Sequence, residues 1–508
     1  MMPATHTHPL DERYKHVKLV ALDWFRDDTG RDESVISGLS IGTTLSCALW
    51  QGLSAICHYA QIYSGQDSSD GILHLPEDSS RLRKKVAAHF GEIRLDKPPT
   101  GELHVDEQYL LPEMLHIPRT ATWVRHAQRP LRSFVRQRKN LYITDWVTAR
   151  ASRSDPNGLV LFRRSLTRTA VPHATSTERE WADGCYPESI DHLLTHDRLQ
   201  ACLLRHDLEF SHDECALFLE YSHGIYREMR PSLVRATAQY ENMLAFYQPE
   251  HVYLPSDGFE TWNIVYQLCQ RRGVTTHMCV DGYMCVPLWP AQRTPDGMDW
   301  LIDRAVAYGP AQRRHIEVTG FPANRIDIAE PPFLQYLSAK TATPQEFDAV
   351  VLTWIPYTVN PQADYTSPIQ TLRSALHVLR DMGFRRIAVK VKSSHEIPYV
   401  RRVAAGLNIE VDVLTGRFYE HVRRAPLVLG GISTALAETV AVGNRYIVYE
   451  PFDNGYPDEM ISQSCIITRE TIARTEVELR TLIASGANSW VGDRAMLTGQ
   501  IDGRSQTH

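Results

Sequence analysis

Residues 427–451, LVLGGISTALAETVAVGNRYIVYEP, carry the clearest chemical signal in the chain. An apolar run ends there in two glycines, followed by two hydroxyl residues and, one turn later, an acid: Gly430, Gly431, Ser433, Thr434 and Glu438. Glycines allow a sharp turn and a close approach of ligand to backbone. The N-terminus of a helix favours phosphate, and a carboxylate one turn further on can accept hydrogen bonds from a ribose diol. The spacing predicts a nucleotide site. The simpler interpretation is a helix cap followed by a solvated acid.

A second candidate group follows another apolar run, in VKVKSSHEIP. Lys390 and Lys392 alternate on one face of the expected strand, and His395 follows in the loop at its carboxyl end. A cation at this position can offset the charge on a departing nucleotide, a role we assign first to Lys392. The alternative is that Lys392 simply extends its charge into water from the strand end.

Two acids in the first half come directly after expected strands. Asp257 follows HVYLPS and Asp281 follows THMCV, and a glycine follows each acid. Because the carboxyl ends of neighbouring parallel strands share one edge of a sheet, the acids are expected in one crevice. A reaction in which the oxygen of an alcohol attacks a donor needs a base that removes the hydroxyl proton. We favour Asp257 or Asp281 as this base, with His277 as a further candidate. The alternative is that Asp-Gly serves only as a turn.

The C-terminal half resembles the nucleotide-sugar-binding domain of GT-B fold glycosyltransferases, particularly bacterial surface- and capsular-polysaccharide transferases. GGISTALAETVAVG carries the resemblance, which is firm over residues 347–457 and only topological over the first half. It implies Ser433 and Thr434 on the donor phosphates, Glu438 on the ribose, and diphosphate binding without a metal or other cofactor. It also implies that YEPFDNG faces the donor sugar, which adds three candidates: Glu450, Asp453 and Asn454.

Two departures from the family pattern stand out. Transferases of this type carry a K-x-H-P-like segment, whereas here Pro398 lies three residues beyond His395. This weakens the case for His395 on the donor phosphate. The family's Q-H-G segment is replaced by V-D-G at residues 280–282.

The elements that must position these residues alternate in the second half. Residues 347–355 form a β-branched apolar run typical of a buried strand. A helix is expected over residues 367–383, with Leu372, Ala375, Leu376 and Leu379 on one face. Further strands and helices alternate up to residue 451, including a helix over RFYEHVRRA, without a hairpin signal. This pattern indicates a parallel sheet with helices on its faces.

The first half is less regular. We expect strands at residues 16–25, in NLYITDW, GLVLF, HVYLP, VTTHMCV and AVAYG, and helices over residues 37–61, 213–248 and up to Arg272. The double proline at 331–332 and the Ala/Thr-rich stretch behind it suggest a linker. The predicted domains are an acceptor-side α/β domain with a helical insertion (1–332), a linker (333–346) and a nucleotide-sugar-binding Rossmann-like domain (347–508). The fold class is α/β and GT-B-like, with two Rossmann-like parallel-sheet domains facing a central cleft.

Composition limits the class of protein. The chain has 508 residues, 43% hydrophobic and 22% charged, with a net charge of −6, which argues against a general nucleic-acid binder. We find no run long enough to span a membrane, the first residues lack the apolar core of a signal peptide, and the nine cysteines form no CxxC pair, so we expect reduced thiols in the cytoplasm. The basic stretches 129–139 and 161–168 predict solvated helix faces or, as a minority alternative, peripheral contact with the inner face of an anionic membrane.

Together these features predict a metal-independent glycosyltransferase of polysaccharide biosynthesis, which moves a sugar from a UDP- or CMP-linked donor to a glycan or glycoconjugate hydroxyl. Three alternatives stay open. They are a UDP-N-acetylglucosamine 2-epimerase-like isomerase, a glycerol-phosphate polymerase-like transferase, and a non-catalytic nucleotide-sugar-binding protein.

Overall fold

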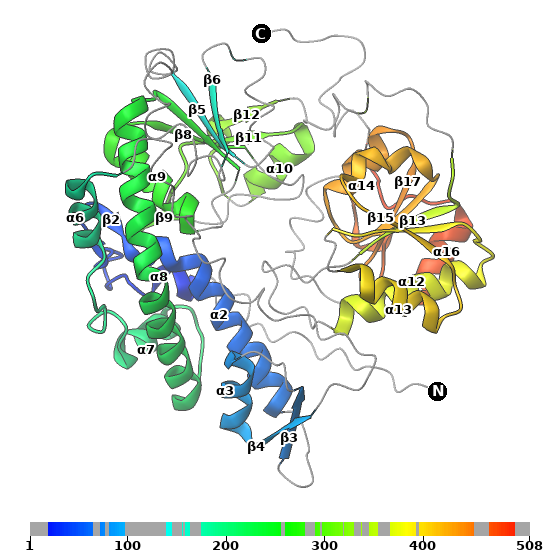
Figure 1. Ribbon diagram of the computed structural model, residues 1–508, viewed down its shortest axis with the longest axis horizontal. Helices are drawn as coiled ribbons and strands as arrows, with labels where there is room; N and C mark the ends of the chain where they lie inside the picture. The colour runs from blue at the N-terminus through cyan, green and yellow to red at the C-terminus, as the bar shows by residue number, and fades with distance from the viewer. Residues whose placement is uncertain are drawn as a thin grey trace, which may run out of the picture.

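Two six-stranded sheets organise the chain in the computed structural model, and the strand pairs within them are parallel. The predicted fold class, α/β with two Rossmann-like sheets, is therefore confirmed. Figure 1 shows the sheets in separate lobes. The central cleft expected between them stays a prediction. The structure describes residues 19–64, 72–76, 81–96, 139–144, 155, 158–162, 174–255, 260–279, 290–294, 297–318, 320–329, 337, 345–353, 366–392, 396–451 and 467–492.

The second sheet has the strand order β15-β14-β13-β16-β17-β18. Counted along the chain this is 3-2-1-4-5-6, the order of doubly wound sheets that bind ligands beyond the carboxyl ends of their strands. The strands that follow β13 in the chain, β14 and β15, lie on one side of it, and β16 to β18 lie on the other. The carboxyl ends of β13 and β16 therefore flank the expected ligand-binding crevice. The strands are β13 (Ala349–Leu352), β14 (Ile387–Lys390), β15 (Val411–Leu414), β16 (Leu427–Gly430), β17 (Arg445–Tyr449) and β18 (Ile472–Ala473).

Helices cover both faces of this sheet (Figure 1). One apolar cluster joins the sheet to α12 (Thr366–Asp381), α13 (Ile397–Gly406) and α16 (Glu476–Ser485). The predicted face of α12 is confirmed, because Leu372, Ala375, Leu376 and Leu379 are all fully buried there. A second cluster joins the opposite face to α14 (Thr434–Ala441). Short 3-10 helices complete the unit: η6 (Phe418–Glu420), η7 (Val422–Arg424) and η8 (Arg469–Thr471).

The first sheet has the order β12-β11-β8-β7-β5-β6, which is 2-1-3-4-5-6 in chain order and flavodoxin-like with one further strand. One of its faces packs on α2, α8 and α9 in a single large core. Its strands are β5 (Asn140–Thr144), β6 (Gly158–Phe162), β7 (His251–Leu254), β8 (Thr275–Cys279), β11 (Arg304–Ala307) and β12 (Ile326–Ile328). Its helices are α2 (Ile41–Ser64), α6 (Ser176–Cys185), α7 (His196–Arg205), α8 (His212–Tyr247), α9 (Glu260–Arg272), α10 (Pro310–Val318) and η4 (Ala323–Arg325).

Three small units extend this part of the chain, and the sequence patterns had not indicated them. A parallel pair, β3 (Ile72–Pro76) and β4 (Glu92–Asp96), is connected through α3 (Arg81–Phe90). Two antiparallel pairs join β1 (Val35–Ile36) to β2 (Leu39–Ser40) and β9 (Pro290–Thr294) to β10 (Gly297–Trp300).

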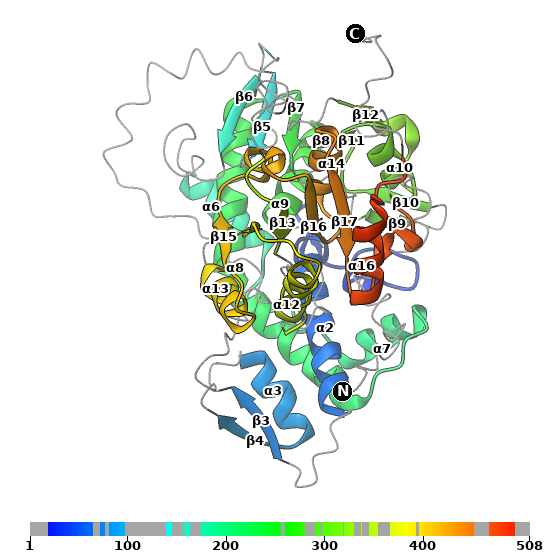
Figure 2. The same cartoon turned by 90° about the vertical axis from the view of Figure 1, so that its right-hand side faces the viewer.

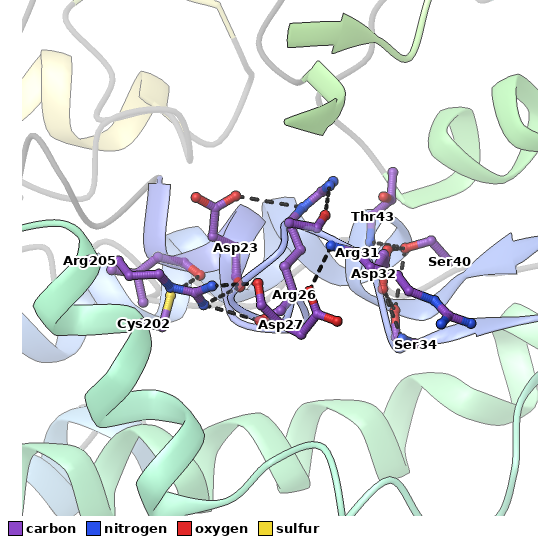
Figure 3. Close-up of polar contacts among 12 residues, drawn as sticks. Asp23, Arg26, Asp27, Arg31, Asp32, Ser34, Ser40, Thr43, Cys202 and Arg205 are labelled. Atoms are coloured by element: carbon purple, nitrogen blue, oxygen red, sulfur yellow. Dashed lines mark hydrogen bonds and ion pairs between the residues drawn. The ribbon is translucent and has the colours of Figure 1, made fainter. Parts of the chain in front are cut away.

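The strand expected at residues 16–25 is wrong, because residues 19–23 are helical. Val20, Ala21, Trp24 and Phe25 belong to the core of the first sheet, whereas Leu22 packs in a separate small cluster, and this spacing is that of one helical face, which the continuous apolar run conceals. At the end of this helix the Arg205 guanidinium donates to three backbone oxygens, those of Asp23, Arg26 and Asp27, at 2.9–3.1 Å (Figure 3).

The helix expected over RFYEHVRRA is also wrong in type. The segment forms η6 and η7, whose backbone bonds span three residues, as from the His421 N–H to the Phe418 oxygen at 2.8 Å. Ala425 then takes an extended conformation (φ −143°), the one favoured before a proline, here Pro426. The segment is therefore too short for a stable α-helix.

One apolar cluster contains residues from both sheet units. Tyr308 and Ala311, near the start of α10, belong to the cluster that contains α14, and Ala329, directly after β12, packs against it. The two views of the ribbon show α10 and α14 on the sides of the lobes that face each other (Figure 1, Figure 2). The last strand of the first sheet ends at Ile328 and the second sheet begins at Ala349, but the boundaries of the predicted linker stay a prediction. None of the helices in the described ranges has the length and apolar character needed to cross a membrane.

Candidate functional site

Gly430 ends β16 at a place where no larger residue fits. A Cβ added there would lie 2.5 Å from the Tyr446 hydroxyl oxygen and 2.9 Å from Leu352 Cδ1. Contacts this short are not tolerated without a shift of the neighbours. Leu352 ends β13 and Gly430 ends β16, so this close packing lies at the reversal of the strand order. The glycine that the sequence singled out is thus required by the packing of the two strand ends.

Two buried residues hold the loop that follows: Tyr446 in β17 and Glu450 directly after this strand. The Tyr446 hydroxyl donates to the Gly431 oxygen at 2.6 Å. The Ile432 N–H donates to Glu450 Oε1 at 2.6 Å. Glu450 is 1% exposed and Tyr446 is fully buried; burial raises the pKa of Tyr446, which keeps its hydroxyl protonated as a donor. Both side chains therefore fix the loop, and a direct contact of Glu450 with a donor sugar stays a prediction.

Ser433 occupies the N-cap position of α14 without acting as a side-chain cap. Its backbone is extended (φ −156°, ψ 170°), and its side chain makes no capping hydrogen bond. Its hydroxyl instead lies 3.4 Å from the Tyr446 hydroxyl. The simpler interpretation of Ser433 as a helix cap therefore does not account for this residue. Ser433 and Thr434 are half-buried, so both present surface at the end of the strand.

Glu438 lies one turn into α14, on a helix whose residues from Ala435 to Ala441 are all buried. Its own exposure is 8%, so it is not the solvated helix residue of the simpler interpretation. Glu438 is also one of the carboxylates whose charge acts on Lys390, the last residue of β14, which is 7% exposed. Burial lowers the pKa of Lys390, and the charges of Glu396, Glu438 and Glu420 act in the opposite direction.

The two lysines of β14 differ sharply in environment. Lys390 is buried and donates from Nζ to the Val391 oxygen, whereas Lys392 is exposed. The backbone N–H of Lys392 donates to Glu396 Oε2 at 3.2 Å, and the Thr353 hydroxyl donates to the same oxygen. Sequence alternation placed both lysines on one face and could not rank them. The structure buries Lys390, the lysine to which no role was assigned, where the charges of Glu396 and Glu438 act on it.

In the first sheet His277 is buried inside a row of rings. Its ring stacks on Tyr253 with centroids 4.3 Å apart, and Tyr253 stacks on Tyr142 at 4.4 Å. His277 Nε2 lies 3.2 Å from His251 Nδ1. Burial, followed by the nearby His251, lowers the pKa of His277 to about 4, so the imidazole is neutral and weakly basic.

Several predicted site residues lie outside the described residues: Asp257, Asp281, His395, Asp453 and Asn454. The basic stretches 129–139 and 161–168 also lie largely outside them. Within the described ranges, no group of three or more His, Cys, Asp or Glu residues could hold a metal ion. The cysteines that the structure describes are buried free thiols.

No protein-family model and no curated protein sequence matches the chain. Among solved structures, it is similar to UDP-GlcNAc 2-epimerase from Neisseria meningitidis, with 9% identity, coverage of 68% of this chain and 90% of that one, and a TM-score of 0.39. It is also similar to the lipopolysaccharide outer core galactosyltransferase WaaB (10% identity, 71% and 93% coverage, TM-score 0.34). TarM from S. aureus matches with 11% identity, 51% and 53% coverage and a TM-score of 0.32. At these values the likenesses decide nothing about this chain's activity, and its own strand orders define its fold.

Proposed function

We propose that the chain is a glycosyltransferase that moves a sugar from a UDP- or CMP-linked donor to a hydroxyl of a glycan or glycoconjugate. The observation that carries this proposal is the loop at residues 430–434, which Tyr446 and Glu450 hold at the reversal point of the second sheet. Doubly wound sheets bind ligands at this point. The loop leads into a helix whose N-cap side chain makes no capping bond, and such a helix start favours phosphate.

In this proposal the second sheet binds the donor. The backbone of Gly430 and Gly431 and the hydroxyls of Ser433 and Thr434 contact the phosphates. Glu438 accepts hydrogen bonds from the ribose. The charges of Lys392 and His395 offset the negative charge that develops on the departing nucleotide. The donor sugar lies near three residues that follow β17: Glu450, Asp453 and Asn454.

The first sheet supplies the acceptor side and the base. Asp257 or Asp281 removes the proton of the acceptor hydroxyl as its oxygen attacks the anomeric carbon. The new C–O bond forms while the bond from the anomeric carbon to the donor phosphate breaks, and the nucleotide leaves with the electron pair. His277 is 7% exposed and its ring is engaged with Tyr253 and His251, so an acceptor hydroxyl would reach it less readily than an acid at a strand end, and we rank it behind the two acids. No metal is required in this scheme.

We place the reaction in the cytoplasm, where the buried free cysteines stay reduced. A peripheral contact of the basic stretches with the membrane would bring the enzyme to lipid-linked acceptors.

The test is product analysis by mass spectrometry after incubation of the full chain with UDP- and CMP-sugars, with and without glycan acceptors. The proposal predicts nucleotide release that depends on acceptor, and an acceptor heavier by one sugar. Glu438→Ala should abolish this reaction, whereas the matched control Glu410→Ala, an exposed acid in the same unit, should retain it.

Three other outcomes would contradict the proposal. Conversion of the donor sugar without acceptor would indicate an isomerase. Phosphate incorporated into the product would indicate a phospho-polyol transferase. Binding without turnover on any acceptor would indicate a nucleotide-sugar-binding protein.

A further inference from the structure

Glu396 is a buried acid at the carboxyl edge of the second sheet, and it does not cap the helix that it precedes. Its exposure is 6%. It occupies the N-cap position of α13, but its side chain makes no capping hydrogen bond. Burying a carboxylate is unfavourable unless hydrogen bonds and opposite charge compensate it. The partners of this side chain lie instead at the ends of two strands.

One oxygen of Glu396 joins these strand ends. Oε2 accepts a hydrogen bond from the Thr353 hydroxyl, directly after β13, and another at 3.2 Å from the backbone N–H of Lys392, two residues after β14. The Tyr399 hydroxyl of α13 lies 3.5 Å from the same oxygen. A backbone bond of 3.2 Å from the Thr353 N–H to the Lys390 oxygen continues the pairing of the two strands. Glu396 therefore fixes both chains beyond their last paired residues.

The negative charge of Glu396 is compensated within the sheet. Lys390 is 7% exposed, and burial lowers the pKa of its ammonium group. Among the neighbouring charges, that of Glu396 acts most strongly in the opposite direction. An uncompensated carboxylate at this edge would repel a phosphate group, because like charges repel each other strongly where water is excluded. With Lys390 beside it, Glu396 can lie close to a phosphate site.

The end of β14 that Glu396 holds carries an exposed cation. Lys392 lies beyond the last paired residue of β14, and its side chain is exposed. β13, the strand next to it, flanks the crevice in which doubly wound sheets bind ligands. A lysine side chain has many rotamers, so a fixed backbone limits the positions that its ammonium group can reach. Less conformational entropy is then lost when this group contacts an anion.

We propose that Glu396 is a positioning residue that fixes the Lys392 backbone, so that the Lys392 ammonium group contacts the phosphate of a nucleotide at the proposed donor site. This inference rests on the proposed function and deepens it. It assigns the phosphate contact to Lys392, whereas Lys390 compensates the charge of Glu396. Glu396 acts on the ligand through Lys392 and does not touch the ligand itself.

The test is calorimetric titration of UDP and of CMP into the full chain. Four proteins are compared: wild type, Glu396→Leu, Lys392→Met and the double variant. Leucine is close to glutamate in size and accepts no hydrogen bond, so Glu396→Leu should bind nucleotide about tenfold more weakly than wild type, and Lys392→Met at least as weakly. In the Lys392→Met background the further loss from Glu396→Leu should be less than about twofold, because the positioned cation is gone.

Two control variants separate the hydrogen bonds from the charge. Glu396→Gln keeps an oxygen that can accept from Thr353 and from the Lys392 N–H, and should bind nucleotide within about threefold of wild type. Glu410→Leu changes an exposed acid of the same unit and should bind as wild type does. A loss from Glu396→Leu that is equal in both backgrounds, or no loss at all, would overturn the inference.

A second measurement does not depend on nucleotide. In amide hydrogen exchange followed by mass spectrometry, the Lys392 N–H should exchange about tenfold or more faster in Glu396→Leu than in wild type, and at the wild-type rate in Glu396→Gln. An unchanged rate in Glu396→Leu would overturn the inference. If Glu396→Leu does not fold, Thr353→Val takes its place, because it removes a hydroxyl that orients the same carboxylate. It should weaken nucleotide binding in the wild-type background and not in Lys392→Met, and equal losses in both would overturn the inference.

The two levels of the argument fail separately. If wild type binds neither UDP nor CMP, the proposed function is wrong and the role of Glu396 falls with it, whereas faster exchange in Glu396→Leu would still establish the bond to Lys392. If wild type binds nucleotide and the loss from Glu396→Leu persists without Lys392, the proposed function stands and the role given to Glu396 falls.

Discussion

Gly430→Ala is the substitution whose effect follows most directly from the geometry of the site. The new methyl group would lie 2.5 Å from the Tyr446 hydroxyl oxygen and 2.9 Å from Leu352 Cδ1, so both side chains must move. Overpacking of this kind costs about 1–3 kcal/mol. Displacing the hydroxyl also breaks its 2.6 Å bond to the Gly431 oxygen and leaves buried polar atoms unpaired, at about 1–3 kcal/mol. The two costs overlap, because displacing the hydroxyl relieves part of the clash, and we expect a total loss of about 2–4 kcal/mol in the free energy of unfolding.

The assay is scanning calorimetry of the full chain, in which the transition of the second unit should move down by about 5–15 °C. Gly406→Ala is the matched control, because nothing lies within 4 Å of its added Cβ and the position is helical; it should be neutral or slightly stabilising. Tyr446→Phe removes the clashing oxygen, so the double variant Gly430→Ala/Tyr446→Phe should lose less stability than the two single losses combined. An unchanged midpoint in Gly430→Ala, or strict additivity in the double variant, would refute the reasoning.

Three further predictions concern acid stability, the loop and a helix cap. Burial lowers the pKa of His315 from 6.5 to about 4, so the unfolded chain binds more protons than the folded chain between these pH values. The folded state therefore loses up to about 3 kcal/mol of stability as the pH falls through this window. His315→Leu should flatten the dependence of urea midpoints on pH between about 6.5 and 4, and an unaltered slope would contradict this. Glu450→Ala removes the acceptor of the Ile432 N–H and should cost about 1–3 kcal/mol and weaken nucleotide binding, whereas Glu450→Gln, which keeps an acceptor oxygen, should lose less; equal losses would argue against the bond. Ser40→Ala removes the acceptor of the Thr43 N–H at the start of α2 and should lower the stability of the first unit by about 1 kcal/mol without affecting nucleotide binding.

The fold of the second half could be predicted from the sequence because its apolar periodicity is regular. The face of α12 and the alternation of strands and helices follow from local pattern alone. Where a short apolar run is continuous, as at residues 16–25, the pattern fits helix and strand equally. There the packing of Trp24 and Phe25 into the core decided for a helix.

The site could be predicted only in part. Gly430, Ser433 and Glu438 were identified from local spacing, and the structure brings all three to one end of the sheet. The support beneath the loop comes from Tyr446 and Glu450, whose contacts cross 15 and 18 residues of chain and leave no local signal.

The alternation of side chains along a strand could not show which of the two lysines of this segment is buried. The strand pattern placed Lys390 and Lys392 on the same face and treated the outer one as the better candidate. The structure buries Lys390 because it is the last residue paired on both sides, to β13 and β15, whereas Lys392 lies beyond the paired residues. Which strand residue is paired last depends on its neighbours in the sheet, and these come from distant parts of the chain.

The central claim is that the loop at residues 430–434 and Glu438 bind the nucleotide of a sugar donor. The most direct test is a thermal-shift panel of UDP, CMP, GDP, ADP and dTDP on wild type and Glu438→Ala. At a hundred times the dissociation constant, a bound nucleotide stabilises the folded chain by about 2.7 kcal/mol. We predict that UDP or CMP raises the midpoint of wild type and leaves that of Glu438→Ala unchanged. No shift with any nucleotide, or an equal shift in both proteins, would contradict the claim.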